Sequence, residues 1–310
     1  MIIADFLVIF SMNSVFLKLH LSVFLGGFTG LFGRLVSLNS IWIAFFRMTI
    51  GGIFFYAYTK STGKCKSLPR SMCLSSMIAG AILALHIAVF YEAIKLSNVS
   101  IGTLTISTIS FFVAVIEPFI AKSRFSLLDI FYSFLGIVGL SFIFSFDARY
   151  RLGIAVGLFG SFLSAVYSCY NRRIMSSPSA DSYTLLNWQF LGASITMTVA
   201  VIINRMLTGQ WEIQFVWSDV FYLLFAGIVC TAGMYLLQLM VFKEISAFTV
   251  MLTYNLEPVY TIIMAVLLFH EDRDFNLSFY GGLCFIIASV LLKTYKVMHT
   301  KNADPGLKSV

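Results

Sequence analysis

Long apolar stretches separated by short polar breaks run along the whole chain. A membrane-spanning helix needs about 20 mostly apolar residues, and segment after segment here has that length. The period-2 alternation of a transmembrane barrel strand does not occur, so the pattern indicates helices, which satisfy their own backbone hydrogen bonds in lipid. We predict ten spans, at 20–38, 40–59, 71–94, 98–121, 126–146, 152–174, 183–206, 218–242, 246–269 and 276–297.

The composition agrees with this all-α, integral membrane fold class. The 310 residues are 59% hydrophobic and only 11% charged, with a mean hydropathy of +0.90. Soluble domains carry about 25% charged residues. Because the connections between spans are short, we expect one compact bundle without a soluble domain. The net charge of +7 does not indicate nucleic acid as a partner, since the basic residues lie in short loops and the C-terminal tail.

The two ends of the chain lie outside the predicted bundle. Residues 1–19 form an N-terminal segment that lacks the basic start and cleavage site of a signal peptide. Asp5 and Asn13 make residues 1–17 a poor span, and Met12 is an alternative start to Met1. Residues 298–310 read as a disordered cytoplasmic tail.

The distribution of basic residues predicts the orientation of the spans. With the N-terminus inside, 14 of the 21 Lys and Arg residues fall on the cytoplasmic side and five on the other, while Arg34 and Arg47 lie within spans. Cytoplasmic loops are enriched in Lys and Arg. Both termini are therefore expected in the cytoplasm of a multi-pass protein of the inner (plasma) membrane, which requires an even number of spans.

Ten spans divide into two halves of five, at 20–146 and 152–297. An odd number of spans per half inserts the second half upside down relative to the first, as in transporters built from inverted repeats. Weak internal similarity supports a duplication, because Thr103 and Ser107 match Thr249 and Thr253 at an offset of 146.

The ninth span carries the most polar stretch at membrane depth. Tyr254, Asn255, Glu257 and Pro258 lie near its middle. Proline removes a backbone donor and clashes with the preceding turn, so we expect a loosened helix there. A charged side chain at the bilayer centre costs about 2.5–3.5 kcal/mol on insertion scales, which makes a solute pathway the default hypothesis. The alternative is that Glu257 is a structural carboxylate satisfied by neighbouring helices.

Arg47 lies in the middle of the second span, between Phe46 and Met48. A guanidinium at this depth must face a cavity or a carboxylate, because hydrocarbon offers no partner. Two interpretations stay open: Arg47 binds the carboxylate or phosphate of a substrate, or it pairs permanently with Glu117 or Glu257.

The third and fourth spans carry further candidates. His86 is either a structural histidine or a pathway residue that titrates near neutral pH. In the fourth span a run of hydroxyl residues that includes Ser107 precedes Glu117 and Pro118. Hydroxyls can bond to their own helix, which makes them weak indicators of a site. Glu117 is a pathway candidate or the partner of nearby basic residues, and Pro118 is a candidate helix break.

Aromatic and amide side chains recur in the later spans. Trp188, Gln189 and Tyr235 are of the type that lines small-molecule sites, although Trp and Tyr also anchor helices at the membrane interface. We find no paired-His metal motif, phosphate loop, nucleophile elbow or dinucleotide fingerprint. The sequence therefore predicts neither an enzyme nor a cofactor or metal site.

Several motifs together carry a family resemblance. Asn255-Leu256-Glu257-Pro258-Val259 is followed by Leu267-Leu268-Phe269-His270-Glu271 and by Gly281-Gly282. Phe46-Arg47 lies in the second span, and residues 93–100 join the third and fourth. On these motifs the chain resembles the EamA branch of the drug/metabolite transporter superfamily over about residues 18–297. The resemblance implies a central cavity between two repeats and alternating access.

The first half departs from the family pattern. The family often has a proline in the middle of its fourth helix and Gly-Glu-Arg at the end, where this chain has Ser107 to Ser110 and then Ser123-Arg124. Glu117-Pro118 occurs lower in the same span instead. The departure means that a substrate known for other members does not transfer to this chain.

These features predict a secondary active transporter, or permease, that moves a small polar metabolite such as an amino acid by alternating access. Its expected partners are that solute and the lipid bilayer, with a proton or another ion as a candidate coupling partner; the oligomeric state is not readable from the sequence. The alternatives are a membrane-embedded lipid-modifying enzyme, and a channel or receptor-like protein. The enzyme would need a polar cluster at the interface, and counterflow would separate a carrier from a channel.

Overall fold

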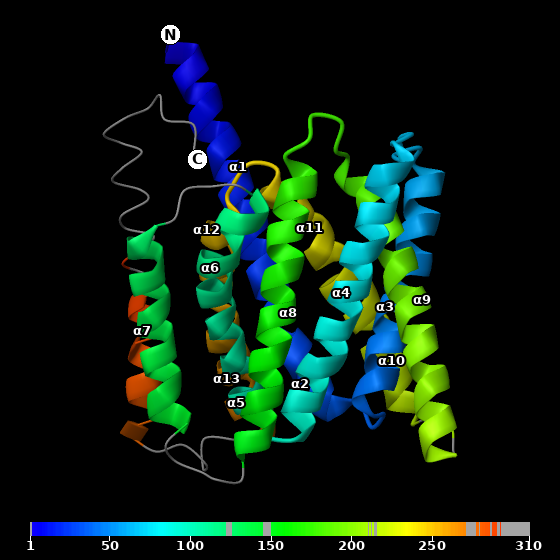
Figure 1. Cartoon of the computed structure of the whole chain (residues 1–310), viewed down its shortest axis with the longest axis vertical. Helices are drawn as coiled ribbons and strands as arrows, with labels where there is room; N and C mark the ends of the chain where they lie inside the picture. The colour runs from blue at the N-terminus through cyan, green and yellow to red at the C-terminus, as the bar shows by residue number, and fades with distance from the viewer. Residues whose placement is uncertain are drawn as a thin grey trace.

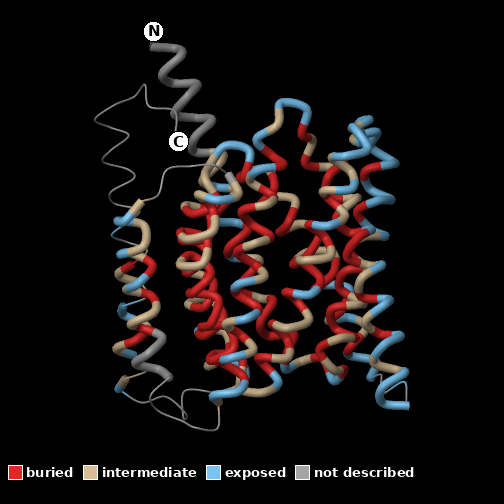
Figure 2. Tube along the Cα trace, in the orientation of Figure 1, coloured by how far each residue is buried: buried red, intermediate tan, exposed pale blue. Residues whose placement is uncertain are grey.

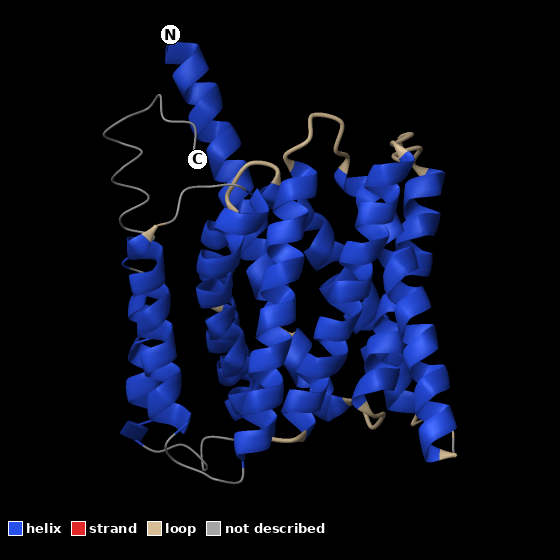
Figure 3. Ribbon diagram, in the orientation of Figure 1, coloured by secondary structure: helices blue, strands red, loops and turns tan. Residues whose placement is uncertain are grey.

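The computed structural model describes residues 2–121, 126–144, 150–209 and 216–270, two residues of the preceding loop (211 and 213), and a set near the C-terminus (277–278, 280–285, 287–289 and 292). Figure 3 shows helices joined by short loops, and the described residues contain no strand. The helices of the first half are α1 (Ile2–Gly27), α2 (Thr29–Leu35), α3 (Ser40–Ser61), α4 (Arg70–Lys95), α5 (Val99–Leu104), η1 (Thr105–Thr108), α6 (Ile109–Ala121) and α7 (Leu127–Phe144).

The second half contains a similar succession of helices. They are α8 (Arg151–Met175), α9 (Ser182–Thr208), α10 (Trp217–Gly227), the π-helical segment η3 (Ile228–Gly233), α11 (Met234–Phe242), α12 (Ala247–Tyr254) and α13 (Glu257–Phe269). The helices run roughly parallel to the long axis of the molecule (Figure 1).

Eight helical stretches among the described residues are long and apolar enough to cross a membrane. They overlap the predicted spans one to four and six to nine. At the predicted fifth and tenth positions the described residues contain shorter apolar helices, Leu127–Gly139 and Tyr280–Ser289. The predicted tail at 298–310 lies outside the described residues. Residues 1–17 were expected to be a poor span of their own. In the structure α1 begins at Ile2, so residues 2–17 form the first part of the same helix that contains the start of the first predicted span.

Buried residues run through the middle of the bundle, and the outer faces are partly exposed (Figure 2). The exposed outer positions include large apolar side chains such as Ile53, Phe119 and Met206. Exposed apolar surface on this scale fits a protein whose surrounding solvent is lipid rather than water.

Polar side chains fix where several helices begin. Asn39, Asn98, Asp181 and Ser246 precede α3, α5, α9 and α12, and each side chain accepts a hydrogen bond from the backbone N–H three residues later. These residue types are preferred at this position because they satisfy an N–H that has no partner within the helix.

The fourth and ninth predicted spans are both interrupted. In the fourth, the run of hydroxyl residues tightens into η1, where Thr105 and Thr108 donate to the carbonyls of Gly102 and Thr105. Such side-chain bonds compete with regular helix geometry. The break expected at Pro118 does not occur, because α6 continues through this residue. The irregular segment lies about ten residues earlier in the chain.

In the ninth span the helix stops at Tyr254, and α13 begins at Glu257. Asn255 and Leu256 form the turn between the two helices. Pro258 lies in the first turn of α13, where its missing N–H removes no intrahelical bond. The proline therefore marks the start of a new helix rather than a kink inside one.

A very close helix crossing, between α4 and α9, joins the two halves. A Cβ added at Gly80 of α4 would lie 1.9 Å from the Gln189 carbonyl oxygen of α9, and one added at Gly192 would lie 2.2 Å from the Met77 oxygen. Only glycine permits backbones this close, which is how small residues drive helix packing in membranes.

We predict that Gly80→Ala forces α4 and α9 apart and destabilises the protein by at least about 3 kcal/mol, the upper end of the usual cost of overpacking. The measurement is the apparent thermal midpoint in detergent. Gly136→Ala is the matched control, because its nearest neighbour lies 3.6 Å from the new Cβ. Equal midpoints for the two variants would contradict the close crossing.

Candidate functional site

A small cavity of about 40 Å³ lies at the centre of the bundle. A cavity needs about 10–15 Å³ to hold one water molecule, so this one has room for roughly three. Its walls come from both halves of the chain. The polar residues that line it are Thr29, Arg47, His86, Ser164, Tyr167, Tyr235, Gln238, Tyr254 and Glu257.

Arg47 of α3 is buried, with 1% of its surface exposed. Its Nε donates to Thr231 Oγ1 at 2.9 Å and its Nη2 to the Cys230 carbonyl at 3.1 Å, while Nη1 donates to the Tyr91 hydroxyl. Within the described part of the chain it forms no ion pair, so a permanent pairing with Glu117 or Glu257, one of the two interpretations left open by the sequence, is not found. Neutral oxygens hold the guanidinium instead.

The π-helical turn η3 provides two of these oxygens. Gly51 and Gly227 bring α3 against this region, since a Cβ at Gly51 would lie 2.7 Å from the Gly227 oxygen. Thr231 donates its own proton to the Ala226 carbonyl five residues earlier and accepts from Arg47. Single π-turns inside helices are frequent at functional sites.

Glu257 begins α13 and also lines the cavity. Among the described residues its carboxylate accepts one hydrogen bond, a long one of 3.4 Å from Thr29 Oγ1. Gly26 packs directly against the carboxylate, because a Cβ added at Gly26 would lie 2.9 Å from Glu257 Oε2. A buried carboxylate with so few donors has acceptor capacity left for a ligand or a proton.

Aromatic and amide groups complete the lining. The Tyr167 and Tyr235 rings meet edge-on at 5.9 Å. The Tyr167 hydroxyl donates to Gln189 Oε1 at 3.2 Å, so Gln189 lies behind the wall and positions Tyr167. Tyr254 and Gln238 also line the cavity, with the Tyr254 hydroxyl beside the Gln238 and Ser22 side chains.

His86 lines the cavity from α4 and is tied to α8. One of its ring nitrogens, Nδ1, lies 2.8 Å from the Gly160 carbonyl oxygen. Since a carbonyl can only accept, this nitrogen carries a proton and the ring is held in place. His86 therefore makes a structural hydrogen bond and also lies on the cavity wall.

Four other predicted site residues lie elsewhere. Trp188 faces a separate groove on the side of the bundle. Asn255 donates to Ser110 Oγ at 3.2 Å and joins the α12–α13 turn to α6. Ser107 is buried in η1 and is not among the lining residues. Glu117 has a structural role, described next.

Glu117 caps the start of α12. Its two carboxylate oxygens accept the backbone N–H groups of Ala247 and Phe248, both at 2.9 Å. A carboxylate at a helix N-terminus satisfies orphan donors and complements the helix dipole. The contact joins the first half of the chain to the second, at one end of the cavity.

Tyr91, Thr29 and Thr231 are not among the site residues predicted from the sequence. Tyr91 lies five residues after His86 on α4 and also donates to the Thr29 carbonyl at 3.2 Å. The sequence indicated only that a buried guanidinium at Arg47 requires several hydrogen-bond acceptors, and it did not show which residues provide them.

Comparisons with known proteins agree with this architecture. The sequence profile of the EamA-like transporter family matches residues 13–145 and 151–295. The chain belongs to the EamA-like transporter family. The two matches show that it contains two EamA repeats. It is also similar to a solved crystal structure, titled only as that of a protein, with a TM-score of 0.68 and 14% identity over 93% of this chain and 99% of the other. No curated protein matches the sequence.

We predict that Glu117→Gln lowers stability by about 1 kcal/mol, and Glu117→Ala by about 2 kcal/mol, since both remove charge-assisted cap bonds. The apparent thermal midpoint in detergent measures this. Glu244→Gln, an exposed carboxylate in the turn before α12, is the control. If all three variants melt with the wild type, Glu117 does not cap the helix.

Proposed function

We propose that this EamA-like protein is a secondary active transporter that moves a small polar metabolite, such as an amino acid or a related compound, across the cytoplasmic membrane. The observation that carries the proposal is the central cavity, which Arg47 and the Glu257 carboxyl group both line without forming an ion pair among the described residues. A solute with both an anionic and a cationic group would satisfy both.

The size of the cavity supports a transport cycle rather than a permanent binding pocket. Small-molecule sites usually enclose about 300–1,000 Å³, and the central cavity has about 40 Å³. A metabolite can enter only if the walls move apart. A site that opens and closes around its ligand is what alternating access requires.

Polar contacts between the two halves occur at both ends of the cavity. At one end Glu117 holds the start of α12. At the other, Asp219 of α10 accepts a backbone hydrogen bond from Ser37 at 3.1 Å and a second one from its hydroxyl. The Trp42 indole also donates to the Trp211 carbonyl at 3.1 Å. We infer that this is an occluded conformation, and that each set of contacts opens in turn.

In this mechanism two inverted five-helix repeats rock about the cavity, with both termini in the cytoplasm. The breaks at η1 and at Asn255–Leu256 allow parts of the fourth and ninth spans to move separately. Arg47 anchors the anionic group of the solute, and Glu257 binds its cationic group or a coupling proton. Tyr254, Tyr235 and Gln238 orient it, while Gln189 acts through Tyr167.

The test is a thermal-stabilisation screen of the purified protein with amino acids, amines and nucleotides at two pH values. A ligand at 100 times its dissociation constant adds about 2.7 kcal/mol of stability. We expect a hit among zwitterionic solutes. We expect Glu257→Gln to lose that shift and its dependence on pH, because glutamine neither carries a charge nor releases a proton.

Glu244→Gln is again the control, and it should bind as the wild type does. A folded Glu257→Gln protein with an unchanged ligand shift and pH dependence would contradict the role of the carboxylate. Chemical turnover of a lipid or prenyl substrate by the purified protein, with no stabilisation by polar solutes, would favour the membrane-embedded enzyme.

A further inference from the structure

A second, larger hollow lies on the outside of the bundle, between α3 and α9. Its volume is about 610 Å³, and it does not share a lining residue with the central cavity. Ile53 and Leu191, both on its wall, are 66% and 46% exposed, so the groove opens sideways from the bundle. Gly52 and Phe190 also line it, in close contact with each other. The proposed transport mechanism does not use it.

The length of the groove corresponds to one leaflet of a bilayer. Its lining on α9 extends from Thr184 to Ser194. Ten residues of helix rise about 15 Å, which is half of the roughly 30 Å hydrocarbon thickness. On α3 the lining starts at Thr49, in the middle of the helix, and reaches Tyr56 near its end. The groove therefore runs from the middle of the membrane to one surface.

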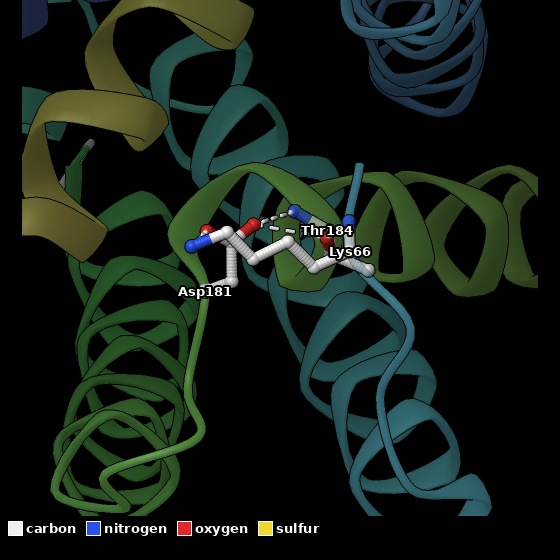
Figure 4. A network of polar contacts seen from close by, with 3 residues as sticks. All are labelled: Lys66, Asp181 and Thr184. Carbon is white, nitrogen blue, oxygen red and sulfur yellow. Dashed lines mark hydrogen bonds and ion pairs between the residues drawn. The ribbon is translucent and has the colours of Figure 1, made fainter. Parts of the chain in front are cut away.

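The surface end of the groove is strongly basic. Lys60, Lys64, Lys66 and Arg70 fall within eleven residues there. Lys66 lines the mouth with 73% of its side chain exposed, and its ammonium lies 3.6 Å from Asp181. Figure 4 shows Asp181 bound at the same time by Thr184, the first lining residue of α9. The carboxylate is thus shared, and the local charge stays positive.

A second lysine, Lys64, directly precedes the mouth residues Cys65 and Lys66 in the chain. The Lys64 ammonium donates hydrogen bonds to the hydroxyls of Tyr58 and Tyr183. These bonds, the one to Tyr58 most of all, raise the pKa of Lys64 above its ordinary value, so its positive charge persists.

We propose that the α3–α9 groove is a binding site for one anionic phospholipid of the leaflet on the Lys66 side. One acyl chain of the lipid fills the apolar part of the groove between Thr49 and Tyr56, and the phosphate lies at Lys66. Basic pockets between membrane helices bind acidic headgroups in this way. Because α3 also carries Arg47, an occupied groove would hold this helix against α9 and so support the central site.

The experiment is native mass spectrometry of the delipidated protein with added phosphatidylglycerol or phosphatidylcholine. We expect one tightly retained phosphatidylglycerol and no equivalent phosphatidylcholine. Lys66→Ala should weaken retention about fivefold, the effect of one lysine near a charged lipid surface. Ser194→Phe should remove it by filling the groove. Lys243→Ala, an exposed lysine between α11 and α12, should change nothing.

Equal retention of both lipids, or equal weakening by Lys66→Ala and Lys243→Ala, would overturn the proposal. A dimer mass in place of bound lipid would show that a second copy occupies the groove, and would also overturn it.

A second measurement needs no substitution. Cys65 lines the mouth, whereas Cys73 on the neighbouring α4 does not. We expect phosphatidylglycerol to slow maleimide labelling of Cys65 several-fold and to leave the rate at Cys73 unchanged. Equal rates at Cys65 with and without the lipid would refute the site even if Ser194→Phe failed to fold.

Discussion

A buried guanidinium that forms no ion pair with any described carboxylate is the constraint on which the centre of this protein depends. Arg47 is almost fully removed from solvent, and its charge is met by a threonine hydroxyl, a backbone carbonyl and a tyrosine hydroxyl. Burying an unpaired charge is costly, so these three acceptors must be held in place. This requirement ties α3 to α4 and to the π-helical turn η3. It also places a positive charge on the wall of the small cavity that Glu257 lines too.

The breaks in the fourth and ninth spans place the ends of short helices around this cavity. Thr261 of α13 donates to the Gly27 carbonyl at 2.7 Å, which ties the second half of the broken span to the end of α1. Glu117 of the fourth span caps the start of α12, the first half of the broken ninth span. In the proposed transport cycle these contacts separate, while the close glycine-mediated crossing of α4 and α9 stays intact.

Hydropathy alone predicted most of the helices, because a membrane span must be long and apolar whatever its neighbours are. The positions of Arg47 and Glu257 in the middle of predicted spans also marked them as candidate site residues, since charged side chains within a span are rare. The faces of the helices were not readable. Trp188 and Gln189 are adjacent, yet one faces the outer groove and the other the interior, because neighbouring helical residues point about 100° apart. Likewise, the role of Glu117 depends on a backbone 130 residues away.

The measurement that tests the transport account most directly is counterflow in proteoliposomes. Vesicles are loaded with an excess of the unlabelled solute identified by ligand screening, and the labelled solute is supplied outside at trace concentration. A carrier that alternates around the Arg47–Glu257 cavity must exchange one molecule for another, so labelled solute should rise transiently above its equilibrium level. Rapid flux without this overshoot would indicate a channel, and would contradict the account.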